Sequence, residues 1–304
     1  MKNSIRIVEV GLRDGLQNEK VNLSLQERID LANRLCSAGV TRMELGAFVR
    51  PDIIPQMAIS EEVVSGLKSN LKIQGSVLVP NEHGMNKAVQ LGVKEVAIFT
   101  GASETFVKKN INCSIEESIN RFKVIAKIAK AKKIKIRGYI STCFGCPYEG
   151  AVDENKVVEI AVRLLKLGCY EISIGDTIGV ATPKQVESLF KKLKRKIPVK
   201  KLAGHFHDTR STSLVNILQA YRLGVTVFDA SICGLGGCPY APGSAGNVAT
   251  EDVVYMFGGM GIKTGLNLNS LIETNKWLSQ VMKKELPSKV GKAGLSKACP
   301  KIIE

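Results

Sequence analysis

The amino-acid sequence predicts an α/β fold, a (β/α)8 TIM barrel, and three observations lead to it. The chain has 304 residues, which fits the roughly 250 residues of such a barrel plus a short appendage. Short β-like runs alternate with longer helical patterns, and eight βα units close naturally into a barrel. No linker-like stretch divides the chain. We therefore expect a single domain over residues 1–304, with the barrel over about 1–265 and a helical extension and tail over about 266–304.

The predicted strands are short runs rich in β-branched and apolar residues. They occupy residues 5–10, 41–46, 72–79, 94–99, 135–141, 170–174, 202–207 and 225–231. Helical patterns separate them: residues 24–39 repeat apolar side chains at helical spacing, and Ser114 with Glu117 forms a capping-box pattern before another helix. Glycines suited to a helix C-cap precede four of the strands, at Gly39, Gly92, Gly168 and Gly224. An open doubly wound sheet is the alternative, but "VGLRDGLQNEK" lacks the GxGxxG loop that such a sheet predicts after its first strand.

Composition limits the classes of function. Hydrophobic residues make up 44% of the chain and charged residues 23%, which is ordinary for a globular protein. No apolar run reaches the ~18 residues of a membrane helix, and "MKNSIRIVEV" is neither a signal nor a transit peptide. We therefore expect a cytoplasmic protein with no membrane partner. The cysteines are scattered, which argues against a disulfide framework, and the CxxC pair Cys143 and Cys146 has no second pair to complete a metal site.

The net charge of +15 has two interpretations. Nucleic acid or a phosphorylated ligand would complement it; alternatively, the lysines form a solvated surface. They cluster in residues 126–137 and 191–201, at expected helix ends, where cations suit the helix dipole. No nucleic-acid-binding signature accompanies them, so we expect no nucleic-acid partner and retain a small phosphorylated ligand.

Polar residues gather where the predicted strands end, and in a barrel of this kind the functional site lies at the C-terminal ends of the strands. These residues are Glu9, Arg13, Asp14 and Gln17 at the first strand, Glu44 in the second, Ser173 and Asp176 at the sixth, His205, His207 and Asp208 at the seventh, and Cys238 and Asn247 after the eighth. Two of the three histidines, a charged pair and a glycine-rich loop thus converge on one rim.

The stretch "AGHFHDTR" (203–210) predicts a metal site. Residues i and i+2 of a strand face the same side, so His205 and His207 both face the barrel mouth, and Asp14 can reach the same space. The alternative is a pair of hydrogen-bonded core histidines. Imidazole and carboxylate ligands without a thiolate favour Mg²⁺ or Mn²⁺, with Zn²⁺, Co²⁺ or Fe²⁺ as the other candidates.

Two further residues have both a structural and a chemical interpretation. Arg13 forms either an ion pair with Asp14 that closes a turn or a fixed cation that stabilises developing negative charge beside a metal. Cys238, in "CGLGGCPYAPGSAGN", is either an inert buried thiol or one that its loop brings close to a ligand. The third histidine, His83, follows Asn81 and is predicted to lie at the start of a helix, on the surface or as part of a cap.

With these residues in place, the chain resembles the 3-hydroxy-3-methylglutaryl-CoA lyase family over essentially its whole length. The similarity lies in "VEVGLRDGLQNEK" (8–20), "KKNINCSIEES" (108–118), "GCPYEG" (145–150), "GCYEISIGDTIGVATP" (168–183) and "GLGGCPYAPGSAGNVATEDVVYM" (234–256). An RDG motif alone would indicate the wider superfamily of metal-dependent Claisen-type barrels, and the cysteine loop narrows the resemblance to the lyases.

The resemblance implies a retro-Claisen enzyme of leucine degradation that splits 3-hydroxy-3-methylglutaryl-CoA into acetyl-CoA and acetoacetate. It implies Mg²⁺ or Mn²⁺ on four ligands, Asp14, His205, His207 and Asn247. His205 or Asp14 would remove the proton of the substrate hydroxyl. Arg13 would stabilise the thioester enolate, and Cys238 would supply a proton to the enolate carbon from a mobile loop.

The resemblance also implies supporting residues and partners. The expected substrate contacts are Arg13, Gln17, Glu44, Ser173 and Asp176, the expected CoA contacts are Lys20, Lys108, Lys109 and Asn110, and the expected supporting residue near Asn247 is Glu251. The implied partners are a small acyl-CoA and a second copy of the chain in a homodimer.

The chain departs from the family pattern near the expected acyl pocket. Ala47 and Arg50 stand in "AFVRP" where a "SFVSP" pattern is common, and Arg210 and Ser211 follow "HFHDT" where Tyr-Gly is common. A related branched or longer 3-hydroxyglutaryl-CoA is therefore one alternative substrate. A Claisen-condensing synthase of the same superfamily is another alternative, although such synthases usually carry C-terminal domains for which this chain has no room. A redox role for Cys299, near the tail, is left open.

Overall fold

The computed structural model describes residues 3–70, 72–237 and 246–303, and it confirms the predicted barrel. Eight parallel strands close in chain order, with β8 hydrogen-bonded to β1. They are β1 (Arg6–Glu9), β2 (Arg42–Ala47), β3 (Gln74–Leu78), β4 (Glu95–Gly101), β5 (Lys135–Ser141), β6 (Glu171–Asp176), β7 (Leu202–Phe206) and β8 (Val227–Ala230). All eight predicted strands are present, with ends that differ by at most two residues from the prediction.

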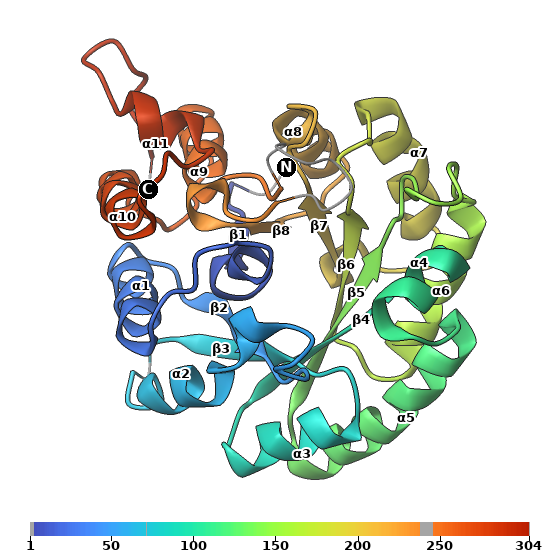
Figure 1. Cartoon of the computed structure of the whole chain (residues 1–304). Helices are drawn as coiled ribbons and strands as arrows, with labels where there is room; N and C mark the ends of the chain where they lie inside the picture. The colour runs from blue at the N-terminus through green and yellow to red at the C-terminus, as the bar shows by residue number, and fades with distance from the viewer. Residues whose placement is uncertain (1–2, 71, 238–245, 304) are drawn as a thin grey trace.

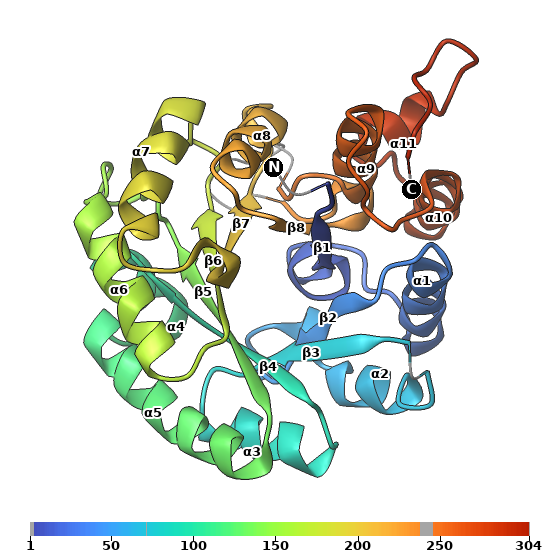
Figure 2. The same ribbon diagram turned by 180° about the vertical axis from the view of Figure 1, so that it is seen from behind.

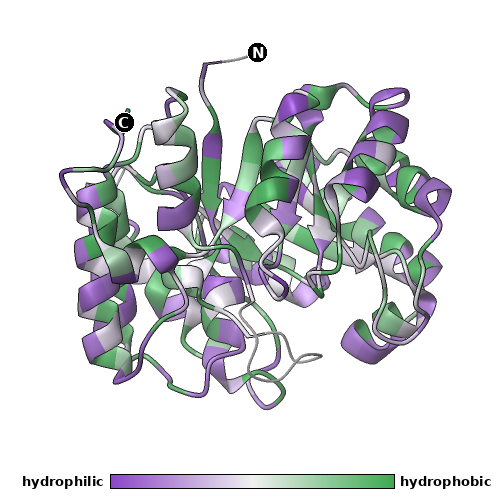
Figure 3. Cartoon of the chain, turned by 90° about the horizontal axis from the view of Figure 1, so that it is seen from above, coloured by the Kyte–Doolittle hydropathy of each residue, from purple (hydrophilic) through white to green (hydrophobic). Residues whose placement is uncertain are grey.

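The helices form an outer ring around the strands, as Figure 1 and the reverse view in Figure 2 show. They are α1 (Leu25–Ser37), α2 (Ser60–Gly66), α3 (Glu82–Gln90), α4 (Glu104–Ile111), α5 (Ile115–Lys132), α6 (Glu154–Lys166), α7 (Pro183–Lys194), α8 (Ser213–Arg222), α9 (Thr250–Gly259), α10 (Leu268–Met282) and α11 (Lys289–Ala293). Their outward faces carry hydrophilic residues (Figure 3). None of the helices in the described part of the chain is long and apolar enough to cross a membrane.

Local sequence signals place several helix ends as predicted. Ser114 caps α5: its hydroxyl accepts from the Glu117 N–H at 3.1 Å, and its own N–H donates to the Glu117 carboxylate at 2.7 Å. The lysine clusters lie at helix ends, with Lys130 and Lys132 in the last turn of α5 and three lysines in the last turn of α7. Asn81 caps α3, so His83 lies in its first turn.

The helical extension consists of α10 and α11. Helix α10 packs against α1 and α9, and α11 packs against α9 and α10. The Asp252 carboxylate of α9 accepts hydrogen bonds from Ser288 Oγ at 3.0 Å and the Val290 N–H at 2.8 Å, which anchors the start of α11. The division into barrel and extension within one domain stays a prediction.

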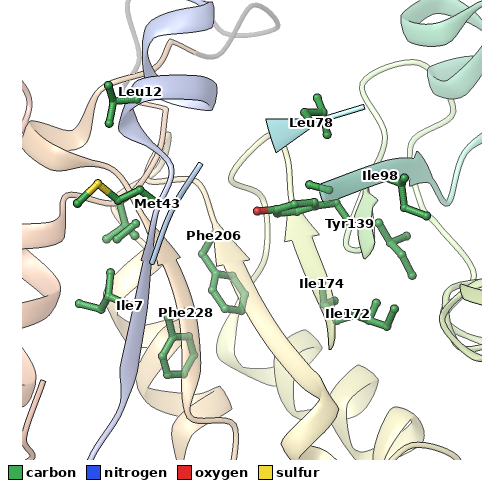
Figure 4. Packing of buried hydrophobic residues seen from close by; sticks show 14 of the residues in the cluster. Ile7, Leu12, Met43, Leu78, Ile98, Tyr139, Ile172, Ile174, Phe206 and Phe228 are labelled. Atoms are coloured by element: carbon green, nitrogen blue, oxygen red, sulfur yellow. The ribbon is translucent and has the colours of Figure 1, made fainter. Parts of the chain in front are cut away.

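The barrel has an apolar layer beneath the helices and a charged network inside. Buried apolar residues of several strands, among them Phe206 and Phe228, are drawn in Figure 4. On β5, Arg137 donates a 2.7 Å hydrogen bond to Asp229 on β8. These strands are not neighbours in the sheet, so the bond crosses the inside of the barrel. The sequence prediction did not include this pair, which is acceptable in a core because each charge neutralises the other.

Candidate active site

A five-residue π-turn directly after β1, η1 (Gly11–Gly15), presents Arg13 and Asp14 at the barrel rim. The Val10 carbonyl accepts from the N–H groups of Arg13 and Gly15, both at 3.1 Å. Gly11 allows the turn to pass close to its neighbours, because a Cβ there would lie 2.6 Å from Glu9 Oε1 and 2.9 Å from a methyl carbon of Ile232. A side chain larger than hydrogen would therefore displace the turn.

The predicted metal ligands lie together. His205 lies in β7 and His207 follows the strand by one residue, and their Nε2 atoms lie 3.1 Å apart. Asp14 Oδ2 lies 3.9 Å from His205 Nε2 and 3.8 Å from His207 Nε2. These three residues form the one group in the described part of the chain whose ligand atoms all lie within 4.8 Å of one another. Two imidazole nitrogens and a carboxylate suit a divalent cation.

Asn247, the fourth predicted ligand, lies at the same place. Its Nδ2 donates to Asp14 Oδ2 at 2.9 Å and to the Leu235 carbonyl at 3.1 Å, and its backbone pairs with that of His207. A residue that follows β8 is thus brought against one that follows β1, because these strands are neighbours in the closed barrel.

Arg13 forms the predicted ion pair. Its guanidinium contacts Asp14 Oδ1 at 2.5 Å and Glu44 Oε2 at 2.6 Å, and its Nε donates to the same Glu44 oxygen at 2.7 Å. Burial alone would raise the pKa of Asp14, but the Arg13 charge and a hydrogen bond with His207 hold that pKa well below its usual range. Asp14 is therefore ionised at neutral pH and is available as a metal ligand.

His205 is oriented from behind by a buried carboxylate that sequence reasoning missed. Its Nδ1 lies 3.2 Å from Asp229 Oδ2, and Asp229 also accepts from Arg137 and, at 2.7 Å, from the Ser173 hydroxyl. Burial favours the neutral acid, but the charge of Arg137 and the bond to His205 lower the pKa of Asp229 below its ordinary value. An ionised Asp229 only accepts hydrogen bonds, so it selects the His205 tautomer with the proton on Nδ1 and leaves Nε2, which lies 3.1 Å from His207 Nε2, as the nitrogen that faces the site.

The signal for this network was present in the sequence. Arg137, Tyr139 and Asp229 are ionisable residues inside apolar strands, in "KIRGYIS" and "VTVFDAS". Tyr139 lies edge-on to His205 with ring centroids 6.3 Å apart, and Arg137 stacks on its ring at 4.7 Å. Ionisable groups are rarely buried unless they are paired. Arg137 and Tyr139 are two residues apart in one strand and therefore point to the same side, which is the inside of the barrel, while the apolar residues beside them point toward the helices.

A cavity of about 150 Å³ opens over these side chains. The predicted residues Arg13, Asp14, Gln17, His205 and His207 line it, together with Asn110 and the apolar or aromatic residues Leu78, Phe99, Phe106, Tyr139 and Ile140. The Oε1 atom of Gln17 is buried and has no partner in the described part of the chain. An amide oxygen of this kind is suited to accept a hydrogen bond from a bound ligand.

Two of the predicted substrate contacts, Ser173 and Asp176, form hydrogen bonds with other residues of the protein. Ser173 is fully buried and bonds to Asp229. Asp176 is buried too, and its two carboxylate oxygens accept from the N–H groups of Val180 and Ala181, each at 3.0 Å. Both residues thus support the site from below, and a direct contact of either with substrate stays a prediction.

The predicted CoA contacts divide into two groups. Among the described residues that line the cavity, Asn110 is the one member of the predicted set. Lys108 and Lys109 line a separate surface groove at the end of α4, and Lys109 Nζ lies 4.4 Å from the centre of the Tyr148 ring. Lys20 is exposed beyond η1.

The remaining predicted residues lie near the glycine-rich loop. Cys238 falls outside the described residues. Glu251 is buried and accepts from the Cys233 N–H at 2.9 Å and from Asn275 Nδ2 at 2.9 Å. It holds the turn η4 (Ile232–Gly234) at the base of that loop, and a role in supporting Asn247 stays a prediction.

The departures from the family pattern occupy two places. Arg210 donates to the Ile178 carbonyl at 2.8 Å and to the Gly179 carbonyl at 3.2 Å, which ties the loop after β7 to the loop after β6. Ala47 is buried at the end of β2, and Arg50 is exposed and paired with Asp52. Arg50 also lines a cavity that shares Gln17 and Asn110 with the cavity over the predicted metal ligands.

Comparison with known proteins gives a consistent result. A family model described as HMGL-like matches residues 4–278. The chain is 49% identical over 289 residues to the mitochondrial hydroxymethylglutaryl-CoA lyase of Pongo abelii, covering 95% of this chain and 89% of that protein. It is 44% identical over 298 residues to the 3-hydroxy-3-isohexenylglutaryl-CoA/hydroxy-methylglutaryl-CoA lyase of Pseudomonas aeruginosa, covering 98% and 99%. The solved structure of an HMG-CoA lyase from Acinetobacter baumannii with coenzyme A and 3-methylmalate superposes with a TM-score of 0.93 at 36% identity, covering 97% of each chain.

Proposed function

Because this chain belongs to the HMGL-like family, we propose that it is a carbon–carbon lyase that cleaves 3-hydroxy-3-methylglutaryl-CoA to acetyl-CoA and acetoacetate. The observation that carries the proposal is the convergence of Asp14, His205 and His207 beside Arg13 at the C-terminal rim of the barrel. A retro-Claisen cleavage requires a hydroxyl to lose its proton and an enolate to be stabilised, and these groups supply both requirements.

A divalent cation, Mg²⁺ or Mn²⁺, is the proposed cofactor. Asp14, His205 and His207 would hold it, with the Asn247 side chain as a fourth ligand. A cation at this place makes the tertiary hydroxyl of the substrate more acidic and fixes its orientation. The two histidines are 8% and 6% exposed, so the site is shielded from bulk water, which strengthens its electrostatic interactions.

The side chains around the cation have distinct proposed roles. His205 or Asp14 accepts the proton of the C3 hydroxyl, after which the C2–C3 bond breaks and C3 becomes the ketone of acetoacetate. The bonding electrons pass to the thioester as an enolate, which the Arg13 guanidinium stabilises. Cys238 then gives a proton to C2 and acetyl-CoA is formed. Glu44 holds Arg13 in position through two contacts with one carboxylate oxygen.

The partners follow from the substrate. An acyl-CoA ligand accounts for part of the positive charge of the chain, since its phosphates require cationic neighbours. We further propose a cytoplasmic homodimer that binds neither nucleic acid nor membranes. Light scattering of the purified protein measures the oligomeric state, and a monomer would contradict that part of the proposal.

The test of the proposed function is incubation of the purified protein with 3-hydroxy-3-methylglutaryl-CoA and Mg²⁺ or Mn²⁺, with and without a thiol reductant. Equal amounts of acetyl-CoA and acetoacetate are expected, and excess EDTA should abolish both products. Absence of acetoacetate under all of these conditions would disprove the proposal. A Claisen-condensing synthase of the same superfamily would instead consume acetyl-CoA together with a 2-oxo acid, and this consumption distinguishes it from the lyase.

A further inference from the structure

A network of alternating charges crosses the inside of the barrel below the predicted metal ligands. Arg42 contacts Glu171 Oε1 at 3.1 Å, and the same oxygen accepts from Arg137 Nε at 2.8 Å. Arg137 Nη2 donates to Asp229 Oδ1 at 2.7 Å, and Asp229 Oδ2 lies 3.2 Å from His205 Nδ1. Positive and negative side chains thus alternate from Arg42 to Asp229, and the network ends at a predicted metal ligand.

The network extends from one end of the barrel to the other. Arg42 and Glu171 are the first residues of β2 and β6, whereas His205 lies near the C-terminal end of β7. Two of its contacts join neighbouring strands, because Glu171 lies beside Arg137 and Asp229 beside His205 in the sheet register. The other two contacts cross the interior, since β2 lies opposite β6 in the closed ring and β5 does not adjoin β8. The end of the barrel remote from the site is therefore connected to a predicted metal ligand.

Arg137 uses its three side-chain nitrogens for three different partners. Besides Glu171 and Asp229, it contacts the hydroxyl of Tyr139 through Nη1, and the Tyr139 side chain points into the barrel in Figure 4. A guanidinium is planar and holds its donors in a fixed fork, so three partners in different directions set its orientation. The Arg137 side chain is 1% exposed, so bulk water cannot replace a partner that is removed.

The two oxygens of Asp229 have separate partners. Oδ1 accepts from Arg137, whereas Oδ2 accepts from the Ser173 hydroxyl at 2.7 Å and faces His205 Nδ1. Arginine often binds a carboxylate through two parallel hydrogen bonds, and a second bond from Arg137 would occupy Oδ2 as well. Nε and Nη1 are the nitrogens that could form this second bond. Because Glu171 holds Nε and Tyr139 holds Nη1, Arg137 leaves Oδ2 to His205.

We propose that Glu171, at the far end of the barrel, is a positioning residue for His205. It holds Arg137 in the orientation that reserves one Asp229 oxygen for His205 Nδ1, and the His205 Nε2 atom is thereby directed to the metal site. Arg42 supports Glu171 from the opposite side of the barrel. The inference rests on the proposed function, in which His205 is a metal ligand, and it adds a residue that touches neither metal nor substrate.

The experiment measures the His205 tautomer and the Mn²⁺ affinity, and neither measurement requires catalysis. Glu171→Gln leaves one neutral oxygen to be shared by two arginines. In the metal-free protein at about pH 8, where an ordinary histidine is neutral, ¹⁵N NMR should show the His205 proton on Nδ1 in the wild type and a mixture of tautomers in the variant. The signals are assigned with His205→Ala.

The Kd for Mn²⁺ should rise about three- to tenfold in Glu171→Gln, less than the loss expected for a residue in direct contact with a metal-binding histidine. Glu171→Met, which removes the acceptor altogether, should have a larger effect on both measurements. If the Met variant does not fold, the Gln variant decides. An unchanged tautomer or an unchanged Mn²⁺ affinity in folded Glu171→Gln would overturn the inference.

The matched control is Glu95→Gln, which removes the same charge at the start of β4. Glu95 lies 3.8 Å from Arg42 and accepts from the Tyr170 hydroxyl at 2.8 Å, instead of contacting Arg137. The control should leave the His205 tautomer and the Mn²⁺ affinity unchanged. Equal effects of the two substitutions would assign them to the charge of the interior rather than to the orientation of Arg137, and would contradict the inference. A protein that shows the expected changes but forms no acetoacetate would retain the inference and disprove the lyase function.

Discussion

At the scale of single residues, the site combines groups that are costly to bury separately. Arg13 lies between the carboxylates of Asp14 and Glu44, and Asp229 lies between Arg137 and His205. Each buried charge therefore has an opposite charge or a hydrogen-bond donor within contact distance. A network of this kind is rigid, and rigidity is what a catalytic group requires if it is to meet the reacting atoms without reorganising.

The role of Arg13 leads to the first prediction. Arg13→Gln keeps a hydrogen-bonding side chain but removes the charge that faces the enolate, so kcat should fall by at least about 100-fold. Mn²⁺ should still bind, since Asp14 and both histidines remain. Steady-state kinetics and Mn²⁺ binding followed by electron paramagnetic resonance measure the two effects. Arg222→Gln on the exposed side of α8 is the control, and a near-wild-type rate for the Arg13 variant would refute the role.

Asp229 is predicted to be a positioning residue for His205. The carboxylate of Asp229 only accepts hydrogen bonds and so fixes the His205 tautomer, whereas the amide of Asn can also donate one. Asp229→Asn should therefore weaken Mn²⁺ binding about 10- to 100-fold. It should also lower the free energy of unfolding, because Arg137 loses one of its two buried carboxylate partners and keeps only Glu171. Metal binding is measured by titration at a temperature at which circular dichroism shows the variant folded. Asp30→Asn on α1 is the control, and an unchanged Mn²⁺ affinity in the Asp229 variant would contradict the prediction.

At the scale of elements, one buried carboxylate joins the beginning and the end of the barrel. Glu9, at the end of β1, accepts from the Gly11 N–H at 2.8 Å, the Ile232 N–H at 2.7 Å and the Thr250 hydroxyl at 2.6 Å. It thereby connects η1, η4 and α9, the three elements that frame the glycine-rich loop. Burial raises the pKa of Glu9 to about 7 despite these hydrogen bonds.

The raised pKa of Glu9 predicts how stability depends on pH. The folded protein binds a proton at Glu9 up to about pH 7, whereas the unfolded chain releases it near the ordinary value of 4.5. The contribution of Glu9 to the free energy of unfolding is therefore fully present below pH 4.5. It is lost as the pH rises to 7, at roughly 1.4 kcal/mol per pH unit. Glu9→Gln should remove this part of the slope, and chemical denaturation at several pH values between 4.5 and 7.5 measures it. Glu62→Gln, on the surface of α2, should leave the slope unchanged; the same slope in both variants would disprove the prediction.

At the scale of the whole molecule, barrel closure assembles the site. The predicted metal ligands come from the turn after the first strand, from the end of the seventh strand and from the segment after the eighth. No short piece of the chain contains them all. A ligand that binds only the assembled set must therefore stabilise the complete barrel against unfolding.

Metal binding is thus predicted to raise the melting temperature. Mn²⁺ at about 100 times its Kd should add about 2.7 kcal/mol to the free energy of unfolding, and EDTA should reverse the increase. His207→Ala should abolish the increase, while His83→Ala, which changes the histidine in the first turn of α3, should retain it. Differential scanning calorimetry with and without Mn²⁺ provides the measurement. A metal-dependent increase that persists in His207→Ala would place the cation elsewhere.

The sequence predicted the fold and the grouping of Asp14, His205 and His207 because both depend on local signals. Alternating strand and helix patterns follow from side-chain periodicity, and His205 and His207 share a face because a strand has a period of two. The interior partners Arg137 and Asp229 were missed because they are far apart in sequence and on strands that do not pair. The CoA contacts Lys20, Lys108 and Lys109 were inferred from the family resemblance and from their charge, and the structure places Lys108 and Lys109 on a separate groove.

By itself, then, the sequence determined the class of fold and the rim at which the candidate site residues gather, because backbone periodicity and strand-end motifs are properties of short segments. Only the tertiary structure decided which carboxylate supports His205, how Glu9 ties the first strand to the last, and that a second cavity adjoins the first at Leu78 and Phe99. These features depend on distances between segments tens to hundreds of residues apart. Such distances follow from the closure and packing of the whole barrel.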